Sequence, residues 1–303
     1  MPLVGAAGIG SMLGSGIIIG LSATITVWQS GLGLTDGQVG ILSGALTFAI
    51  AAGSLLAGNI TKLFGLIRSF NMMNLMYLIG AAICVLSGNF PVLLAGLIIT
   101  GFASGADLPI SLTVISHDAP NEKVSASLIA STQVFWQIGV LGSYAMAFIV
   151  SHVEGAAGAR MVFALLAVLA GIAFVWRTFS KKFKEFHAAG DEYRAAEGTK
   201  TSTEVSFASL FKGTDGKKYV SFFSCIIIFY VCWNLLANTF GQFQTYILVK
   251  ANASQSLATG CGIVLNIVGL ICGILFASAA GSKHRNKFFY VGIVIQAGAM
   301  IGI

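Results

Sequence analysis

Apolar residues occupy the chain in long stretches of roughly 17–25 residues, and polar or charged segments separate one stretch from the next. A helix of about 20 apolar residues crosses the hydrocarbon core of a bilayer, which is about 30 Å thick. Nine such stretches can be delimited, at residues 8–28, 38–58, 69–87, 91–113, 126–151, 160–176, 219–242, 256–279 and 288–303. The pattern therefore predicts an all-α polytopic membrane protein with about nine transmembrane spans.

One polar segment is much longer than the others and separates the first six spans from the last three. We therefore expect an N-terminal six-span bundle at residues 1–177, a central loop at 178–218 and a partial C-terminal bundle at 219–303. The ninth stretch runs to the last residue without an anchoring charged or aromatic residue.

The start of the central loop has a helical pattern. Phe179, Phe183 and Phe186 recur every three or four residues, with lysines on the other faces. Two interpretations are open. The segment is either a helix that lies in the membrane interface with its phenylalanines toward lipid, or an ordinary tethering linker.

Basic residues are distributed unevenly between the two sides of the predicted membrane. When alternate loops are assigned to opposite sides, all but two of the 17 Lys and Arg residues fall on one side, the exceptions being Arg160 and Lys250. Positively charged loops are retained in the cytoplasm during insertion. We therefore expect a multi-pass protein of the cytoplasmic membrane with its N-terminus in the cytoplasm.

The overall composition agrees with a membrane protein and excludes several functions. Hydrophobic residues make up 56% of the chain, charged residues 9%, and the mean hydropathy is +0.87. The net charge of +6 fits loops that meet anionic lipid, and the sequence carries no aromatic-basic patch or glycine-rich phosphate loop, so we expect no nucleic-acid partner. The four histidines lie in predicted loops without metal-binding spacing, and no catalytic triad or dicarboxylate pair lies at membrane depth. We therefore expect no metal, no cofactor and no enzymatic activity.

The arrangement of six spans, a long charged loop and a second set of spans resembles the major facilitator superfamily of secondary transporters. The resemblance includes the loop after the second span, where that family carries Gly-x3-Asp-(Arg/Lys)-x-Gly-x-(Arg/Lys)-(Arg/Lys). Here Gly58, Gly65 and Arg68 match this motif, whereas Lys62 replaces its acid. The resemblance implies that Gly58, Gly65 and Arg68 take part in gating, and that the acid-dependent latch between the two bundles is altered.

The fourth span and the loop that follows it are similar to the sugar-porter branch of this family. The matching residues are Gly96, Gly101, Gly105 and Pro109, followed by the sequence Ile115-Ser-His-Asp-Ala-Pro. Leu97 and His117 stand where that branch carries arginine and glutamate. The resemblance implies transport of a sugar, polyol or sugar acid by alternating access.

A weak internal repeat indicates two related halves. Gly53-Ser-Leu-Leu-Ala closes the second span, and Gly273-Ile-Leu-Phe-Ala closes the eighth. Span 8 then corresponds to span 2, and span 7 to span 1. We therefore expect that the sequence is a C-terminally truncated piece of a twelve-span protein.

Amide side chains within the spans are the strongest candidates for contact with a hydroxylated solute. Amides both donate and accept hydrogen bonds, and an aromatic plane beside them suits the face of a sugar ring. The alternative is that the amides bond one helix to another. The predicted substrate-binding residues are Gln133, Trp136 and Gln137 in the fifth span, Asn234, Asn238 and Gln242 in the seventh, and Asn266 in the eighth.

Asp107 is the ionisable residue that lies deepest within a predicted span. A charged group in hydrocarbon is costly and normally faces the bundle interior or water. Asp107 is therefore either the site of a coupling proton or cation, or a structural group that bonds the backbone near Pro109 or lies close to the interface.

The leading hypothesis is a secondary active or facilitative transporter of a small polar metabolite, with a proton as the candidate coupling ion and the lipid bilayer as surroundings. The altered latch and the absence of an acid from the first span are also compatible with a non-transporting sensor of the same fold, or with an inactive fragment.

Overall fold

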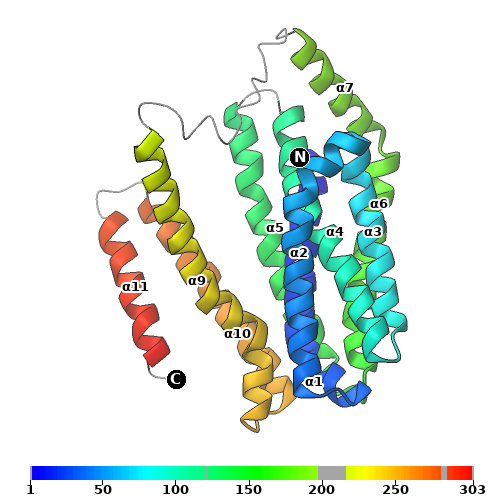
Figure 1. The fold of residues 1–303 in the computed structure, drawn as a ribbon, viewed down its shortest axis with the longest axis vertical. Helices are drawn as coiled ribbons and strands as arrows, with labels where there is room; N and C mark the ends of the chain where they lie inside the picture. Colours follow the sequence, from blue (N-terminus) through cyan, green and yellow to red (C-terminus); the bar gives the residue numbers. More distant parts are fainter. Residues whose placement is uncertain (1, 120–121, 197–215, 281–284, 302–303) are drawn as a thin grey trace.

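The computed structural model describes residues 2–119, 122–196, 216–280 and 285–301, and within these ranges the chain forms ten α-helices and no strand. Figure 1 shows their arrangement. The helices are α1 (Pro2–Leu32), α2 (Asp36–Phe64), α3 (Leu66–Leu86), α4 (Phe90–Asp118), α5 (Glu122–Ile149), α6 (Ala157–Phe179), α7 (Lys181–Ala196), α9 (Gly216–Lys250), α10 (Gln255–Ala280) and α11 (Arg285–Ile301).

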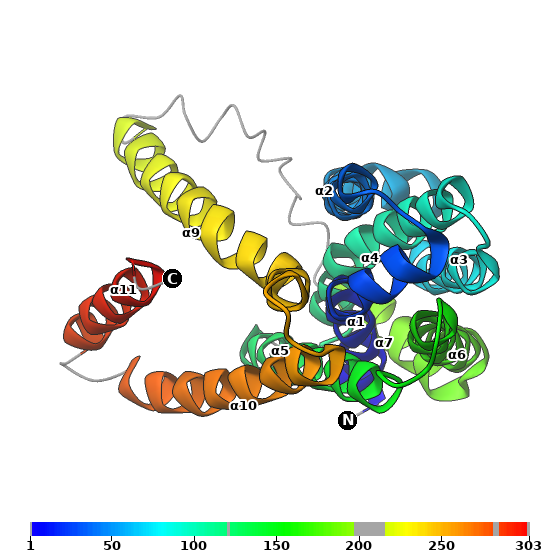
Figure 2. The same ribbon diagram turned by 90° about the horizontal axis from the view of Figure 1, so that it is seen from below.

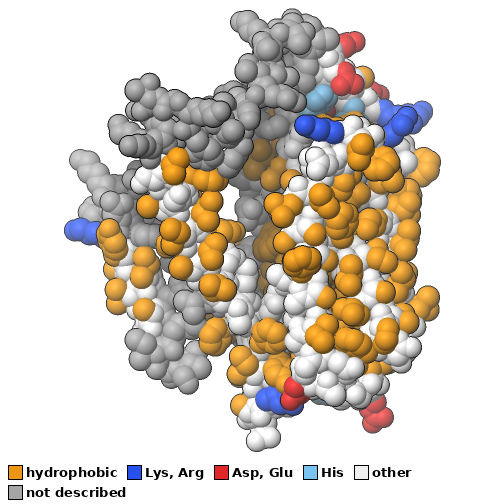
Figure 3. Space-filling view, in the orientation of Figure 1, with side chains coloured by type: hydrophobic (Ala, Val, Ile, Leu, Met, Phe, Trp, Pro, Cys, Tyr) orange, Lys and Arg blue, Asp and Glu red, His pale blue; other side chains and the backbone are white. Residues whose placement is uncertain are grey.

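Each predicted span overlaps one long helix, namely α1 to α6 and α9 to α11. Six helices of the described chain are long and apolar enough to cross a membrane. In Figure 3, hydrophobic side chains cover the visible flank of the α1–α6 bundle, whereas charged side chains gather toward its two ends. The predicted fold class, an all-α membrane protein, is therefore confirmed.

Short connections between the first helices are shaped by local capping. Thr35 caps α2: its side chain accepts from the backbone N–H of Gln38, and the Gln38 side chain accepts from the Thr35 N–H. Asn89 caps α4 in the same manner by accepting from the Val92 N–H at 3.1 Å. Gly65 joins α2 to α3 with φ +84°, a backbone conformation that favours glycine.

Helices α1 to α6 form one bundle, with α1 running through it. Of the apolar window of α1, 78% is buried inside the protein. Helices α2 and α4 approach closely, because a Cβ on Gly105 would overlap the Ile50 carbonyl and a Cβ on Gly53 would overlap the Phe102 carbonyl. Close backbone contact through small residues is typical of membrane bundles.

Helices α9, α10 and α11 lie beside this bundle (Figures 1 and 2). Helix α9 packs against α1, and α10 packs against α5. We call the end of the molecule that carries α7 the linker end, and the opposite end, with the turn at residues 250–255, the turn end. In Figure 1, α9 and the bundle lie together at the turn end and diverge toward the linker end.

The phenylalanine pattern of the central loop does form a helix, but its apolar side faces protein. Phe183 is buried and Phe186 partly buried against a cluster that includes Ile110 and Val114 of α4. Phe179 belongs to α6 and is exposed. The interpretation of this side as lipid-facing is therefore wrong for Phe183, because the end of α4 offers it an apolar surface. The rest of the central loop, residues 197–215, lies outside the described residues.

Candidate functional site

Three amides of α9 and a hydroxyl of α2 line a hollow of about 310 Å³. Gln242 Nε2 donates to Thr47 Oγ1 at 2.8 Å. Asn238 Nδ2 donates to Asn234 Oδ1, and Asn234 Nδ2 donates to the Tyr230 carbonyl at 2.8 Å. The three predicted amides of this span are therefore brought together in one row that faces α2.

A stripe of hydroxyl residues runs along one side of α1 and meets three other helices in turn. Ser15 Oγ donates to the Trp136 carbonyl of α5 at 2.7 Å. Ser22 Oγ donates to the Gly241 carbonyl of α9 at 2.8 Å, next to Gln242. Thr26 Oγ1 donates to Gln255 Oε1 of α10 at 2.6 Å. The hydroxyls of α1 thus hold α9 and α10 in place beside the hollow.

The amides of α5 lie on the side of that helix that faces α10. Tyr144 packs against α10, because a Cβ on Gly262 would overlap its ring. Gln133 and Gln137 lie on the same face of α5 as Tyr144 by helical spacing, nearer the linker end, and Gln133 is exposed while Gln137 is half-buried. Whether they reach the same space as the α9 amides remains a prediction.

Two other predicted residues have structural partners. The Trp136 ring lies 3.5 Å from the position of a Cβ on Gly14, so it packs against α1. Asn266 Nδ2 donates to the Gly262 carbonyl of its own helix at 2.8 Å. The Asn266 amide is therefore partly satisfied by the backbone of its own helix. Contact of either residue with a solute stays a prediction.

At the turn end, several polar contacts join the two groups of helices. Lys250 Nζ lies 3.1 Å from Asp36 Oδ1 of α2. Gln255 accepts from Thr26 and also donates to the Ala23 carbonyl of α1 at 2.7 Å. The hydroxyls of Ser151 and Ser256 lie 2.8 Å apart. The turn between α9 and α10 is therefore bonded to α1, α2 and the end of α5.

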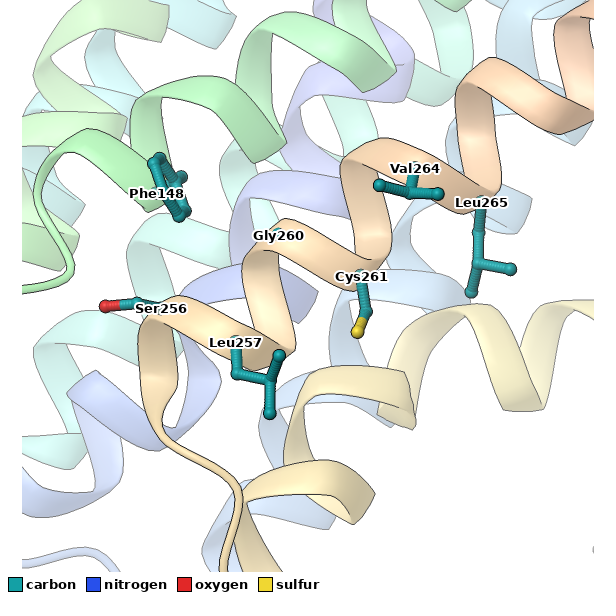
Figure 4. A pocket seen from close by; sticks show the side chains of 7 residues that line it. All are labelled: Phe148, Ser256, Leu257, Gly260, Cys261, Val264 and Leu265. Carbon is teal, nitrogen blue, oxygen red and sulfur yellow. The ribbon is translucent and has the colours of Figure 1, made fainter.

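A second hollow, of about 630 Å³, lies between α5 and α10. Figure 4 shows Phe148 on α5 and the other lining residues along α10, with Ser256 contributing the polar side chain. Such a lining suits hydrocarbon better than a hydroxylated solute. This hollow contains no predicted site residue.

Asp107 lies in a buried polar network near the linker end. Its carboxylate accepts from Arg177 Nη1 at 2.6 Å and from Arg177 Nη2 at 3.2 Å. Arg177 also donates to the Phe70 carbonyl at 3.0 Å, and the Asn74 carbonyl oxygen, turned toward the guanidinium, accepts from Nη1 and Nε at 2.8 and 3.0 Å. Ser111 Oγ donates to Asp107 Oδ2 at 3.3 Å.

The network needs space that α1 provides. A Cβ on Gly10 would overlap Asp107 Oδ2, so the helix carries glycine at that point. The Arg177 guanidinium also lies over the Phe70 ring, 3.8 Å from its centroid. Asp107 therefore has charged and polar partners from α4 and α6, an outcome that its position in the sequence did not indicate.

The three residues of the gating motif lie around the connection between α2 and α3. Gly58 and Arg68 are exposed, and Gly65 supplies the positive φ of the turn. The structure thus gives Gly65 a backbone role. The gating role of all three residues stays a prediction.

Sequence reasoning missed Ser22, Thr47 and Gln255. A signal was present for Ser22, because Ser11, Ser15, Ser22 and Thr26 fall on one face of α1. Hydroxyl residues are common in membrane helices and bond readily to their own backbone, so spacing alone did not distinguish these from ordinary packing residues.

Comparison with known proteins identifies the family. The family model of the Major Facilitator Superfamily matches residues 4–303. The chain belongs to the major facilitator superfamily. It is 30% identical to the minor myo-inositol transporter IolF of Bacillus subtilis over 292 aligned residues. The alignment covers 94% of this chain and 64% of IolF. The chain is 26% identical over 153 residues to D-xylose-proton symporter-like 2 of Arabidopsis thaliana, covering 50% of this chain and 30% of that protein.

Solved structures share the fold of this superfamily member. The crystal structure of a D-xylose-proton symporter matches with a TM-score of 0.69 at 15% identity, over 92% of this chain and 68% of that chain. The xylose transporter XylE from E. coli, in a partially occluded inward-open conformation, matches with a TM-score of 0.69. The match covers 94% of this chain and 74% of that chain. The predicted superfamily is confirmed, and its members point to a transporter and not an enzyme. The chain spans 64% of the length of IolF.

Proposed function

We propose that the protein carries a small neutral polyol or sugar across the cytoplasmic membrane by alternating access. The observation that carries this proposal is the row of amides on α9 with Thr47 opposite, around a hollow between the two groups of helices. The names of its relatives, a minor myo-inositol transporter and a D-xylose-proton symporter-like protein, support a hydroxylated substrate.

The chemistry of the lining suits such a solute. Each hydroxyl of a polyol donates one hydrogen bond and accepts others, and amide and threonine side chains can do both. The lining residues are Thr47, Val231, Asn234, Leu235, Asn238, Thr239 and Gln242, none of which is ionisable. A neutral solute can therefore enter without leaving a charged side chain unpaired.

The distribution of contacts supports an inward-facing state. In the proposed orientation the linker end faces the cytoplasm, which agrees with the excess of basic residues predicted on that side. The two exceptions, Arg160 and Lys250, are both paired at the turn end: Arg160 Nη2 donates to the Ser87 carbonyl at 2.7 Å, and Lys250 lies against Asp36. The bonded turn end would then close the outer side while the α9 amides are reached from the cytoplasm.

Coupling to protons is the finer part of the proposal. Asp107 is the candidate proton site, and its ion pair with Arg177 supplies a mechanism, because protonation of the carboxylate would remove the charge that holds the guanidinium. The pair joins α4 to α6, so protonation of Asp107 would change the contact between these two helices.

Ligand-induced stabilisation of the purified full-length protein tests the substrate class. We expect myo-inositol or D-xylose to raise the melting temperature and an amino acid to leave it unchanged. Uptake by vesicles then separates a transporter from the alternative, a sensor that binds without moving its ligand. Stabilisation by an amino acid and by no polyol or sugar would contradict the proposed substrate class.

A further inference from the structure

Two histidines and two aspartates, His117, Asp118, His187 and Asp191, join α7 to the end of α4. We call these four residues the His–Asp cluster. The Asp118 side chain is fully buried, with Oδ1 2.7 Å from His117 Nδ1 and Oδ2 2.5 Å from His187 Nδ1. One carboxylate of α4 is thus shared by an imidazole of each helix.

A second carboxylate completes the cluster from the side of α7. His117 Nε2 lies 3.3 Å from Asp191 Oδ1, and the Asp191 side chain is 76% exposed. Gly190 permits this approach, because a Cβ there would stand 2.9 Å from both Asp118 Oδ1 and His117 Nδ1. Residues 187, 190 and 191 lie on one face of α7 by helical spacing, so the whole face is built against the end of α4.

Apolar packing holds the first half of α7 independently of the cluster. Phe183 is 1% exposed and its ring stacks on His187 with centroids 6.4 Å apart. It also meets the Trp176 ring edge-on at 5.5 Å. The cluster therefore adds a polar contact to the second half of a helix whose first half is already anchored.

The protonation of His117 decides whether both of its ring nitrogens donate a hydrogen bond to a carboxylate. A neutral imidazole has one N–H, whereas His117 has a carboxylate at each ring nitrogen. Both contacts become donor–acceptor bonds when the ring is a cation, and one nitrogen lone pair opposes a carboxylate when the ring is neutral. Asp118 itself lies at the C-terminus of α4, where the helix dipole disfavours an anion, so it depends on imidazole donors.

We propose that the His–Asp cluster is a pH-sensitive latch for α7. Protonated His117 binds Asp191 and holds the second half of α7 on α4. The bond from His117 Nε2 to Asp191 exists while the ring carries both N–H groups and is lost at higher pH, when the ring is neutral. Among the described residues, the charged groups bonded to His117 are Asp118 on its own helix and Asp191 on α7, and the titratable His187 of α7 meets the other oxygen of Asp118.

The latch has a direct structural consequence for the proposed transporter. Helix α7 belongs to the segment that joins α6 to α9, so its docking sets how much of that segment is bound to the α1–α6 bundle. The inference rests on the proposed orientation only in that the pH sensed by the cluster is that of the cytoplasm. Docking itself does not depend on any substrate.

Amide hydrogen exchange of residues 187–196 in the purified protein tests the latch without a transport assay. Between pH 6 and pH 8, after correction for intrinsic exchange rates, we expect local opening to rise roughly 2- to 5-fold, as for loss of one partly exposed ion pair. Amides of residues 100–108 in α4 serve as the internal reference and should not change.

Asp191→Asn is the decisive variant, because its amide can donate to the Nε2 lone pair of neutral His117. We expect docking in this variant to be retained at pH 8 and the pH dependence to disappear. Glu192→Gln, a change at the neighbouring exposed acid, is the matched control and should keep the wild-type pH dependence. Exchange that is independent of pH in the wild type, or an Asp191→Asn variant with unchanged pH dependence, would overturn the proposal. If the protein shows this exchange pattern but does not transport, the proposed function is wrong and the latch is still supported.

Discussion

Arg177 at the end of α6 lies 2.6 Å from Asp107 of α4, and both side chains are buried. The pair is bidentate, and the guanidinium is also bonded to the Phe70 carbonyl. A buried charge that loses its partner is strongly destabilising, whereas a pair with further hydrogen bonds is well tolerated. The pair therefore fixes the linker ends of α4 and α6 relative to each other.

Asp107→Asn should lower the stability of the protein, by about 3 kcal/mol on the scale of broken buried pairs. The variant leaves the Arg177 cation without its carboxylate, although the other acceptors remain. Thermal unfolding in detergent measures the change. Arg177→Met together with Asp107→Asn removes both charges and should recover part of the loss.

The same variant bears on coupling. If Asp107 binds the coupling proton, Asp107→Asn should still catalyse exchange of solute across the membrane but should not accumulate it in response to a pH gradient. Undiminished gradient-driven accumulation would assign Asp107 a purely structural role.

The amides of α9 should contribute individually to affinity. Gln242→Ala or Asn238→Ala should weaken solute binding roughly 2- to 13-fold, the loss of one neutral hydrogen bond of about 0.5–1.5 kcal/mol. Titration of the purified protein with myo-inositol measures the dissociation constant. Thr113→Ala removes a hydroxyl bonded to its own helix at Pro109 and should have no effect. Equal affinity in all three variants would place the solute elsewhere.

A disulfide at the turn end should lock the protein. The hydroxyls of Ser151 and Ser256 are 2.8 Å apart, so cysteines at these positions can approach the geometry of a bridge. Oxidised Ser151→Cys/Ser256→Cys should bind solute without exchanging it, and reductant should restore exchange. Each single cysteine variant is the control. Full exchange by the oxidised double variant would show that this end need not open.

Close packing of α2 on α4 should be sensitive to one methyl group. Gly105→Ala places a Cβ against the Ile50 carbonyl and should cost about 1–3 kcal/mol. Gly142→Ala is the matched control, because nothing lies within 4 Å of its added Cβ. A comparison of their melting temperatures measures the difference, and equal temperatures would mean that the helices separate at little cost.

The positions of the helices could be predicted from the sequence because hydrocarbon imposes one requirement on every span. Backbone N–H and C=O groups in hydrocarbon must hydrogen-bond within their own segment, so a stretch of about 20 apolar residues predicts a helix. The amides at 234, 238 and 242 could be singled out for a similar reason, since polar side chains in an apolar helix need hydrogen-bond partners. All three amides line the hollow beside Thr47, and their contact with a solute stays a prediction.

Pairings between distant segments could not be predicted in this way. Arg177 lies beside the basic central loop in the sequence, and its partner Asp107 lies 70 residues away, so no local pattern indicates their ion pair. The phenylalanines of α7 have the spacing of a lipid-facing helix, and the same spacing suits packing on α4. Local patterns specify a face of a helix but not the surface that this face meets.

Solute counterflow most directly tests the central claim that this fold moves a polyol by alternating access. The full-length protein is reconstituted in vesicles loaded with unlabelled myo-inositol, and uptake of labelled myo-inositol from outside is followed without any ion gradient. We predict transient accumulation of label that is abolished by oxidation of Ser151→Cys/Ser256→Cys and restored by reductant. Saturable binding with no counterflow would contradict the account and identify the protein as a sensor.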